Sequence, residues 1–407
     1  MKKNGQNCSG RWYFCRNRAI VYELYSGMFL LCRSWNRRDM LRFAMLLFRC
    51  FPHGGLQTDF RRILEECIRR GHDVTVFCGA WEGPLPEGAR VRQVSCKCLS
   101  NHRSALCFQE KVSGLLREEN FDLVLGFNRM AGLDLYFAAD SCFAAGHRGW
   151  FGRIFNPRER IFRRMEKAVF DPRSATRILA LTQGQKEQYQ DCYGTQDERF
   201  ILIPPGISRA CRRPEKEEII HAARQQIRRE FHIPPHARLL VEIGSSFQTK
   251  GVDRNILAMA TLPADVHFLV AGREKSSRFR KLAESLNVLD RVHFAGPRDD
   301  VPTLLFAADG MVHPARREAA GNALAEAAAA GLPVLCTSVC GYAGIVRAAG
   351  GMVSEGEFRQ SEWNRLLAEF LAGLEERRRQ AVQYAGNADL FRRPEFVTDE
   401  MERLCRS

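Results

Sequence analysis

The sequence predicts an α/β protein built from two doubly wound halves that face each other across a cleft. Apolar strands alternate with helices along the chain, and the alternation starts afresh after Pro204-Pro205-Gly206. The length of 407 residues, with 45% hydrophobic composition, supplies enough material for two domains. We therefore expect a first half over 40–206, a second half over 207–385 and a C-terminal helical segment over 386–407.

In the first half, apolar runs predict strands over 41–48, 74–78 and 123–127, with a helix from about Leu56 to Arg70 that stops at Gly71. Gly54 and Gly55 lie between the first strand and this helix. Paired glycines let the backbone approach a ligand closely and leave N–H groups pointing outward, although a plain tight turn explains them equally. No Gly-x-Gly-x-x-Gly follows the first strand, so this is not the dinucleotide fingerprint.

In the second half, strands are predicted over 239–244, 266–271, 292–295 and 310–313. A run of strong helix formers then predicts a helix that opens at Glu318 and ends at Gly331. Asp299 and Asp300 precede a further helix, where capping explains them better than a metal site does. Two more helices are expected, over 363–379 and from Pro394 to Cys405.

Glu318 and Glu326 are the carboxylates of greatest interest. On one continuous helix, residues eight apart differ by about 80° around the axis and roughly 12 Å along it. At the rim of a cleft, such a pair could bind two ends of one long ligand. The ordinary alternative is an N-terminal Glu favoured by the helix dipole together with an exposed Glu further along.

The net charge of +14 indicates an anionic partner. No apolar run approaches the 18 residues of a membrane-spanning helix. The 15 cysteines are scattered without a Cys-x-x-Cys pair, which argues against a zinc or disulfide framework and favours reduced thiols in a cytoplasmic protein.

Residues 1–39 differ from the rest of the chain, with eight Lys or Arg against only Glu23 and Asp39. They fit a secretory signal poorly, because no small-residue cleavage site follows the apolar part. We expect this basic leader to be disordered, or an artefact of start-site choice with Met40 as the functional start.

The segment 147–167 interleaves cations with bulky apolar side chains, the pattern of a segment that binds an anionic membrane surface. A helix packed on the core with solvated cations is the alternative. No nucleic-acid-binding motif accompanies these charges, so no nucleic acid partner is expected. The predicted membrane-binding residues are Arg148, Trp150, Arg153, Phe155, Arg160, Arg163 and Arg164.

Matching motifs occur in order from Met40 to near the C-terminus, over 51–60, 81–83, 126–140, 204–207, 250–254, 318–321 and 339–343. Together they resemble the lipopolysaccharide core glucosyltransferases of the retaining glycosyltransferase family 4, which have the GT-B fold of two Rossmann-like domains. The resemblance implies metal-independent transfer of glucose from UDP-glucose to an inner-core heptose of lipopolysaccharide, at the inner face of the inner membrane. It also implies that the last helix crosses back to the first half.

The resemblance further implies roles for individual residues. Asp140, Lys250 and Glu318 would be catalytic, with Lys250 at the diphosphate and Glu318 at the donor-sugar hydroxyls. Asp140 would orient the acceptor, and a structural hydrogen-bonding role is the alternative for it. Glu326 would bind the ribose and Arg298 would border the uracil. The whole implied donor site comprises Gly54, Gly55, Asp59, Lys250, Arg298, Glu318, Ala319, Ala320, Gly321, Asn322 and Glu326.

One position departs from the family pattern. Thr249 stands where the family usually has an Arg, and a hydroxyl cannot replace an Arg fork on phosphate. Arg273 either supplies the positive charge that is missing at position 249 or is an ordinary surface charge. Two alternatives therefore remain: a transferase for another UDP-sugar, or a non-catalytic relative that binds membranes or polyanions. The sequence also leaves open whether retention proceeds by front-face attack or through a covalent carboxylate intermediate.

Overall fold

The computed structural model describes residues 40–52, 54–96, 98–140, 142–146 and 156–406, and the backbone of two short strands nearer the N-terminus. Those strands, β1 (Phe14–Cys15) and β2 (Arg18–Ala19), pair antiparallel. Residues 41–407 form one compact unit by themselves. Apart from β1 and β2, the predicted leader over 1–39 lies outside the described residues.

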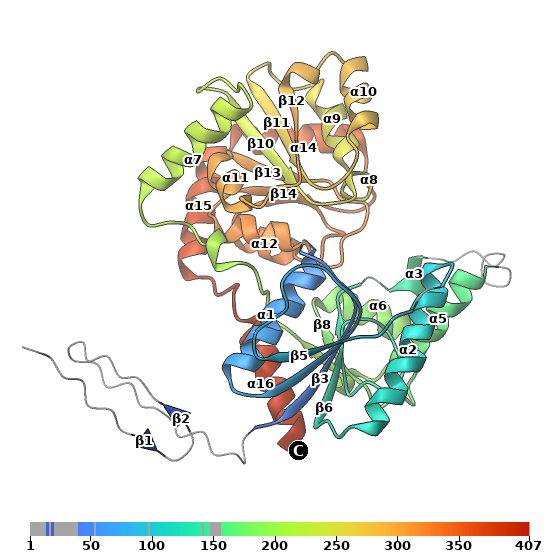
Figure 1. Ribbon diagram of the computed structural model, residues 1–407. Helices are drawn as coiled ribbons and strands as arrows, with labels where there is room; N and C mark the ends of the chain where they lie inside the picture. The colour runs from blue at the N-terminus through green and yellow to red at the C-terminus, as the bar shows by residue number, and fades with distance from the viewer. Residues whose placement is uncertain are drawn as a thin grey trace, which may run out of the picture. The chain divides into compact units, whose positions relative to one another are not determined.

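The first sheet of the compact unit has seven parallel strands in the order β5-β4-β3-β6-β7-β8-β9 (Figure 1). Its strands are β3 (Arg42–Cys50), β4 (Asp73–Trp81), β5 (Ala89–Gln93), β6 (Leu123–Gly126), β7 (Leu135–Ala138), β8 (Arg177–Ala180) and β9 (Phe200–Leu202). The helices in this part are α1 (Gly55–Arg69), α2 (Asn101–Glu118), α3 (Phe143–Gly146), α5 (Pro157–Phe170) and α6 (Gln183–Tyr193), with the 3-10 turn η2 (Asp197–Arg199).

The second sheet has six parallel strands in the order β12-β11-β10-β13-β14-β15. Its strands are β10 (Arg238–Ile243), β11 (Val266–Ala271), β12 (Val292–Gly296), β13 (Gly310–His313), β14 (Val334–Thr337) and β15 (Met352–Ser354). The helices are α7 (Glu217–Glu230), α8 (Phe247–Lys250), α9 (Val252–Met259), α10 (Ser277–Ser285), α11 (Val301–Ala307), α12 (Asn322–Ala329), α13 (Ala343–Ala348), α14 (Gln360–Ala372), α15 (Leu374–Asn387) and α16 (Arg393–Arg406), with the turns η3 (Arg209–Cys211) and η4 (Leu289–Arg291).

Both sheets are covered by helices on both faces, as parallel sheets require (Figure 1). All six residues of β11 are buried for this reason. The predicted strands are confirmed, several of them longer than expected. The predicted fold of two parallel α/β halves is therefore confirmed.

Two details of the helix predictions are wrong. The single helix expected over 363–379 is divided, because α14 ends at Ala372 and α15 begins at Leu374, with Gly373 between them. Asp300 precedes α11, but its side chain does not cap the helix. Its carboxylate binds Arg298 instead, because a charged guanidinium is a stronger donor than a backbone N–H.

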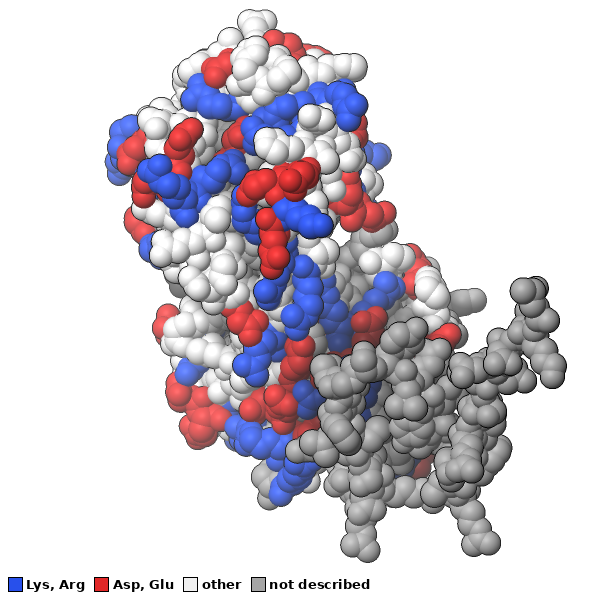
Figure 2. Space-filling view, turned by 90° about the vertical axis from the view of Figure 1, so that its left-hand side faces the viewer, with Lys and Arg blue, Asp and Glu red and all other residues white. Residues whose placement is uncertain are grey.

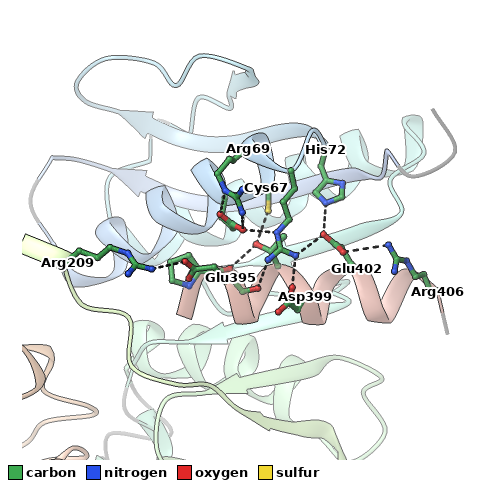
Figure 3. Close-up of polar contacts among 12 residues, drawn as sticks. Cys67, Arg69, His72, Arg209, Glu395, Asp399, Glu402 and Arg406 are labelled. Atoms are coloured by element: carbon green, nitrogen blue, oxygen red, sulfur yellow. Dashed lines mark hydrogen bonds and ion pairs between the residues drawn. The ribbon is translucent and has the colours of Figure 1, made fainter. Parts of the chain in front are cut away.

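The last helix, α16, lies against α1 (Figures 1 and 3). Arg70 at the end of α1 pairs with Asp399 at 2.6 Å and with Glu402 at 3.0 Å. Glu402 also lies 3.0 Å from Nε2 of the buried His72. These contacts join the C-terminal residues to the first half of the unit.

Candidate functional site

Glu318 lies in the loop between β13 and α12 rather than on the helix. α12 begins only at Asn322, because Gly321 has a φ of 95°, a left-handed conformation that interrupts helical geometry. Glu318 forms an isolated parallel bridge with Cys340. The prediction that Glu318 and Glu326 share one helix is therefore wrong, and helical spacing does not set their separation.

A lysine and a histidine hold the Glu318 carboxylate. Its Oε2 atom accepts a hydrogen bond from Nζ of Lys250, the last residue of α8, and lies 3.3 Å from Nε2 of His313, the last residue of β13. Burial raises the pKa of Glu318, but the hydrogen bond with His313 and the charge of Lys250 outweigh burial and lower it to about 2. Glu318 is therefore an anion at neutral pH. Within the described chain its Oε1 atom has no hydrogen-bond partner, so this oxygen can accept from a ligand.

The turn that carries Lys250 packs tightly on the loop that carries Glu318. Gly251 has a φ of 87°, and a Cβ at this position would lie 2.1 Å from the carbonyl oxygen of Pro314. No side chain fits there without moving the backbone. The close approach is what places Lys250 beside Glu318.

Thr249 neighbours an arginine that is already ion-paired. The backbone N–H of Arg316 donates to the Thr249 carbonyl at 2.8 Å. The guanidinium of Arg316 donates two hydrogen bonds to Asp253, at 2.8 and 2.7 Å. Arg273, considered above as a replacement for the missing family Arg, is exposed.

Two helix N-termini approach each other beside this loop. Gly55 is the first residue of α1 and Asn322 is the first residue of α12. A Cβ on Gly55 would lie 3.8 Å from the side-chain amide nitrogen of Asn322. The first N–H groups of a helix lack intrahelical acceptors and carry partial positive charge, so both termini can bind an anion. The Oδ1 atom of Asn322 is buried without a hydrogen-bond partner in the described structure. Gly54 is packed against the side chain of Gln57, which a Cβ would meet at 2.2 Å.

The carbonyl groups of Ala319 and Ala320 are used within the protein. The Ala319 carbonyl accepts from the Thr182 hydroxyl at 3.4 Å and would lie 2.1 Å from a Cβ on Gly341. The Ala320 carbonyl accepts from the backbone N–H of Tyr342 at 2.8 Å. These contacts fix the path of the loop that leads into α12.

Glu326 is partly buried in the middle of α12. Burial raises the pKa of its carboxyl, and the charge of Arg62 on α1 opposes that shift. No hydrogen bond reaches the Glu326 side chain from any described residue. A carboxyl with two unoccupied oxygens is suited to accept hydrogen bonds from the hydroxyl groups of a ligand.

Asp59, predicted to bind the donor, is paired with an arginine. Its Oδ2 atom accepts a hydrogen bond from Nη1 of Arg393 at 2.7 Å, and both side chains are buried. The same guanidinium donates to the Tyr342 hydroxyl at 2.5 Å and to the Pro204 carbonyl at 3.0 Å. Asp59 is held here because a buried guanidinium needs an anionic partner.

Arg298, predicted to border the uracil, is likewise occupied. It forms two hydrogen bonds of 2.7 Å to Asp300 and also pairs with Glu230 on α7. These carboxylates raise the pKa of the guanidinium. The structure does not bring Arg298 into contact with Glu318 or Lys250, so the charge of Arg298 is balanced locally.

Asp140 lines a pocket of about 280 Å³ in the first half. The pocket combines aromatic walls with amide, guanidinium and carboxylate groups, and Arg129 in its wall lies 3.3 Å from Glu166. Such a mixture suits a sugar, whose ring faces pack on aromatic rings while its hydroxyls need polar partners. The lining residues include Phe48, Phe108, Phe162, Asn101, Asn128, Arg129 and Asp140.

The predicted membrane segment is only partly described. Arg148, Trp150, Arg153 and Phe155 lie outside the described residues. The remainder forms α5, where Arg160 and Arg164 are exposed and Arg163 pairs with Glu159 at 3.0 Å. A pocket of about 580 Å³ lies along the end of α5 and the turn after it, and its lining residues include Arg163, Arg164, Lys167 and Arg173.

Elsewhere on the surface, charges of both signs alternate. On the face shown in Figure 2, basic and acidic side chains are interspersed rather than gathered into one basic patch. Arg365 pairs with Glu362 and Glu369 along α14. The net positive charge of the chain therefore does not by itself mark a polyanion site on this face.

Sequence reasoning missed three residues that organise the site. His313 ends the strand before Pro314, and a polar residue at the end of a buried strand is a usable signal. Tyr342 lies in the motif over 339–343 and Arg393 directly precedes Pro394. Neither position indicates the hydrogen bonds from Arg393 to Asp59 and Tyr342, which exist only after distant segments pack together.

The described residues contain neither a membrane-spanning helix nor a cluster of metal ligands. No helix is both long and apolar enough to cross a lipid bilayer. No group of three or more His, Cys, Asp or Glu side chains is placed to hold a metal ion. The described cysteines are all free.

Two parallel α/β halves, with a lysine–glutamate pair in the second half next to the N-terminus of α12, have the architecture of the GT-B glycosyltransferases. Residues 53–210 match the family model described as Glycosyltransferase Family 4, and residues 223–387 match the model described as Glycosyl transferases group 1. The chain is 40% identical over 369 residues to the lipopolysaccharide glucosyltransferase WaaG of Escherichia coli (strain K12), covering 88% of this chain and 97% of that protein. It belongs to this family of retaining hexosyltransferases, which confirms the resemblance seen in the sequence.

Solved structures agree with this assignment. The crystal structure of WaaG, a glycosyltransferase involved in lipopolysaccharide biosynthesis, matches with a TM-score of 0.82 at 39% identity, over 88% of this chain and 99% of that one. Anabaena Alr3699/HepE, solved in complex with UDP and glucose, matches with a TM-score of 0.71 over 89% of this chain and all of that one. At 16% identity, the second match supports the fold alone.

Proposed function

We propose that this protein transfers glucose from UDP-glucose to an inner-core heptose of lipopolysaccharide, with retention at the anomeric carbon and without a metal ion. The observation that carries the proposal is the 40% identity, over nearly the whole length, to a lipopolysaccharide glucosyltransferase. The ionised Glu318 provides a hydrogen-bond acceptor for the sugar hydroxyls, and Lys250 beside it provides a cation for the diphosphate.

Departure of UDP from the sugar builds negative charge on the leaving phosphate oxygen. Lys250 and the N-terminus of α12 would stabilise this charge more in the transition state than in the ground state, which is the condition for catalysis. The Lys250 ammonium has three N–H donors, so it can bind the diphosphate while it still donates to Glu318.

The donor would extend from Glu318 to Glu326. The free Oε1 atom of Glu318 would accept from the glucose hydroxyls, and the unpartnered carboxyl of Glu326 would accept from the ribose. The backbone of 319–322, with Gly54 and Gly55 opposite Asn322, would hold the diphosphate between them. Arg298 and Asp59 are left out of this donor site, because they pair with residues outside it: Arg298 with Asp300 and Glu230, and Asp59 with Arg393.

The pocket lined by Asp140 would take the acceptor. Its aromatic side chains would pack on the ring of the acceptor sugar, and Asp140 would orient the acceptor hydroxyl. In this arrangement, residues 40–206 form the acceptor domain, 207–385 form the nucleotide-sugar domain, and 386–407 return to the first domain.

The acceptor is a lipid-linked glycan, so the enzyme would work at the inner face of the inner membrane. Exposed Arg160 and Arg164 on α5 support contact with anionic headgroups. Co-sedimentation with vesicles tests this step: binding to anionic but not to neutral vesicles at moderate salt is expected, and equal binding to both contradicts it.

A panel of UDP-sugars, incubated with purified heptosylated core lipid and read by mass, tests the activity. Addition of one glucose from UDP-glucose supports the proposal. Transfer from UDP-galactose or UDP-N-acetylglucosamine alone would indicate a different donor. Absence of UDP-sugar binding in calorimetric titration would leave the non-catalytic alternative, for which the missing Arg at position 249 is the motivating observation.

A further inference from the structure

A chain of buried polar groups runs from Glu318 into the core of the second half. Glu242, which follows the apolar residues 239–241 of strand β10, is only 1% exposed. Its Oε2 atom accepts a hydrogen bond of 2.8 Å from the Asn255 amide, and the Asn255 oxygen accepts one of 3.0 Å from the Trp363 indole. Burying a carboxyl is costly unless its polar atoms are paired, so its presence in this strand calls for an explanation.

The other oxygen of Glu242 faces His313. Oε1 of Glu242 lies 3.8 Å from Nδ1 of His313, and neither atom has a hydrogen-bond partner in the described part of the chain. On the opposite edge of the ring, Nε2 of His313 lies 3.3 Å from Oε2 of Glu318. The imidazole, itself 1% exposed, therefore lies between a buried carboxyl and the carboxylate of the proposed donor site.

The surroundings of Glu242 favour its neutral form. Burial raises the pKa of Glu242 well above its usual value, and Asp253 and Cys340 act in the same direction, against Asn255 and Lys250. A neutral carboxyl has one O–H donor, and Nδ1 of a neutral imidazole protonated on Nε2 is an acceptor. Closing the gap by about 1 Å would bring the two atoms to normal O–H···N distance.

We propose that Glu242 is a positioning residue for Glu318, acting through His313. As a neutral acid it donates to Nδ1, which keeps the imidazole proton on Nε2, where it is donated to Oε2 of Glu318. Lys250 and His313 then share one oxygen of Glu318, and the other oxygen faces the donor sugar. This inference rests on the proposed function only in that Glu318 contacts the donor.

Three variants test the idea by kinetics with the full chain and its sugar nucleotide. Glu242→Gln keeps an oxygen for Asn255 and an N–H for His313, so it should retain kcat to within about threefold. Glu242→Leu removes the donor to His313 and should lower kcat by about 10- to 100-fold, the usual cost of a slightly misplaced group. Val270→Ala, in the same core and away from His313, controls for lost packing and should change kcat by less than about twofold.

The pattern among these variants decides the result. If Glu242→Gln is as impaired as Glu242→Leu, the charge of Glu242 matters and the neutral-acid role is overturned. If Val270→Ala loses as much kcat as Glu242→Leu, Glu242 acts only through packing.

The tautomer of His313 can be read without any activity. The chain has 10 histidines, and long-range proton–nitrogen NMR spectra of histidine-labelled protein can be assigned by the loss of one ring in His313→Gln. We expect the tautomer with the proton on Nε2 in the wild type, and a mixture of tautomers in Glu242→Leu. A doubly protonated His313 in the wild type would indicate an ion pair and overturn the proposal. If no sugar nucleotide is turned over, this measurement still decides the inference, while the proposed function alone fails.

Discussion

Removing the Arg393 guanidinium should destabilise the protein strongly, because this group is the common partner of three distant segments. It binds Asp59 on α1, Tyr342 in the loop before α13, and the Pro204 carbonyl. Arg393→Met keeps similar bulk but leaves all three without their donor. A lysine could not replace it, because one ammonium cannot reproduce the directions of three guanidinium nitrogens.

The magnitude follows from the burial of the pair. Arg393 is 0% exposed and Asp59 is 5% exposed, so water cannot replace the lost partner. Leaving one buried charge uncompensated costs about 3–5 kcal/mol, and we expect Arg393→Met to lower the free energy of unfolding by about 4 kcal/mol. Asp59→Asn in the same background should recover about 2 kcal/mol, since a neutral amide is cheaper to bury.

The pH dependence has a definite sign. Burial raises the pKa of Asp59, with Arg393 opposing. Without Arg393 the folded-state pKa of Asp59 should rise further above the unfolded value. Protonation of Asp59 then favours the folded state, and this stability is lost as pH rises through the folded-state pKa. The deficit of Arg393→Met should therefore be smaller at pH 5 than at pH 8.

Urea unfolding followed by tryptophan fluorescence measures these differences. Arg365→Met is the matched control: Arg365 pairs with Glu362 and Glu369 but its side chain is 60% exposed, so the loss should stay below about 1 kcal/mol. A deficit for Arg393→Met no larger than that of the control, or one that Asp59→Asn leaves unchanged, would refute the reasoning.

Four further predictions concern the site. The folded-state pKa of Glu318 is lowered to about 2, so its ionisation contributes about 3 kcal/mol to the free energy of unfolding. This contribution is present above the unfolded-state pKa and is lost as the pH falls from about 5 to 2. Acid unfolding of Glu318→Gln should lack this component. Gly251→Ala should lower the free energy of unfolding in urea by about 1–3 kcal/mol and impair turnover, because Gly251 has a φ of 87° and the neighbouring backbone leaves no room for a Cβ. Gly114→Ala is the control: a Cβ there would have nothing within 4 Å, so the change should be neutral or slightly stabilising. Equal effects of the two substitutions would contradict the argument. Glu326→Ala should weaken UDP binding about 10-fold by calorimetry while Glu318→Ala mainly lowers kcat, and wild-type kinetics in both would exclude the donor orientation. Thr249→Arg should lower the donor KM or raise kcat in steady-state assays, and no change in either would show that the site already compensates.

Much of the fold could be predicted because it depends on local sequence pattern. The apolar run at 266–271 predicts β11 to the residue, since a central parallel strand needs apolar side chains on both faces. The edge strand β5, Ala89–Gln93, was not predicted, because none of its residues is buried and it carries no apolar run.

The candidate site was predicted less completely. Lys250 and Glu318 were named from the sequence, and the structure places them in contact. The expected helical spacing between Glu318 and Glu326 failed at Gly321, because the strong helix formers around it do not reveal the left-handed turn. Asp59 was assigned to the sugar, although its partner Arg393 lies 334 positions away in the sequence.

The sequence by itself determined the two α/β halves, the family and the chemical types of the site residues. These properties depend on local periodicity and on short motifs, which neighbouring residues define. Only the tertiary structure decided which carboxylates are free to meet a ligand. Glu326 accepts no hydrogen bond from a described residue, and Glu318 keeps one oxygen free beside Lys250 and His313. Both oxygens of Asp300 and one oxygen of Asp59 are bound by arginines. Charge pairing depends on three-dimensional proximity and burial, and neither can be read from spacing along the chain.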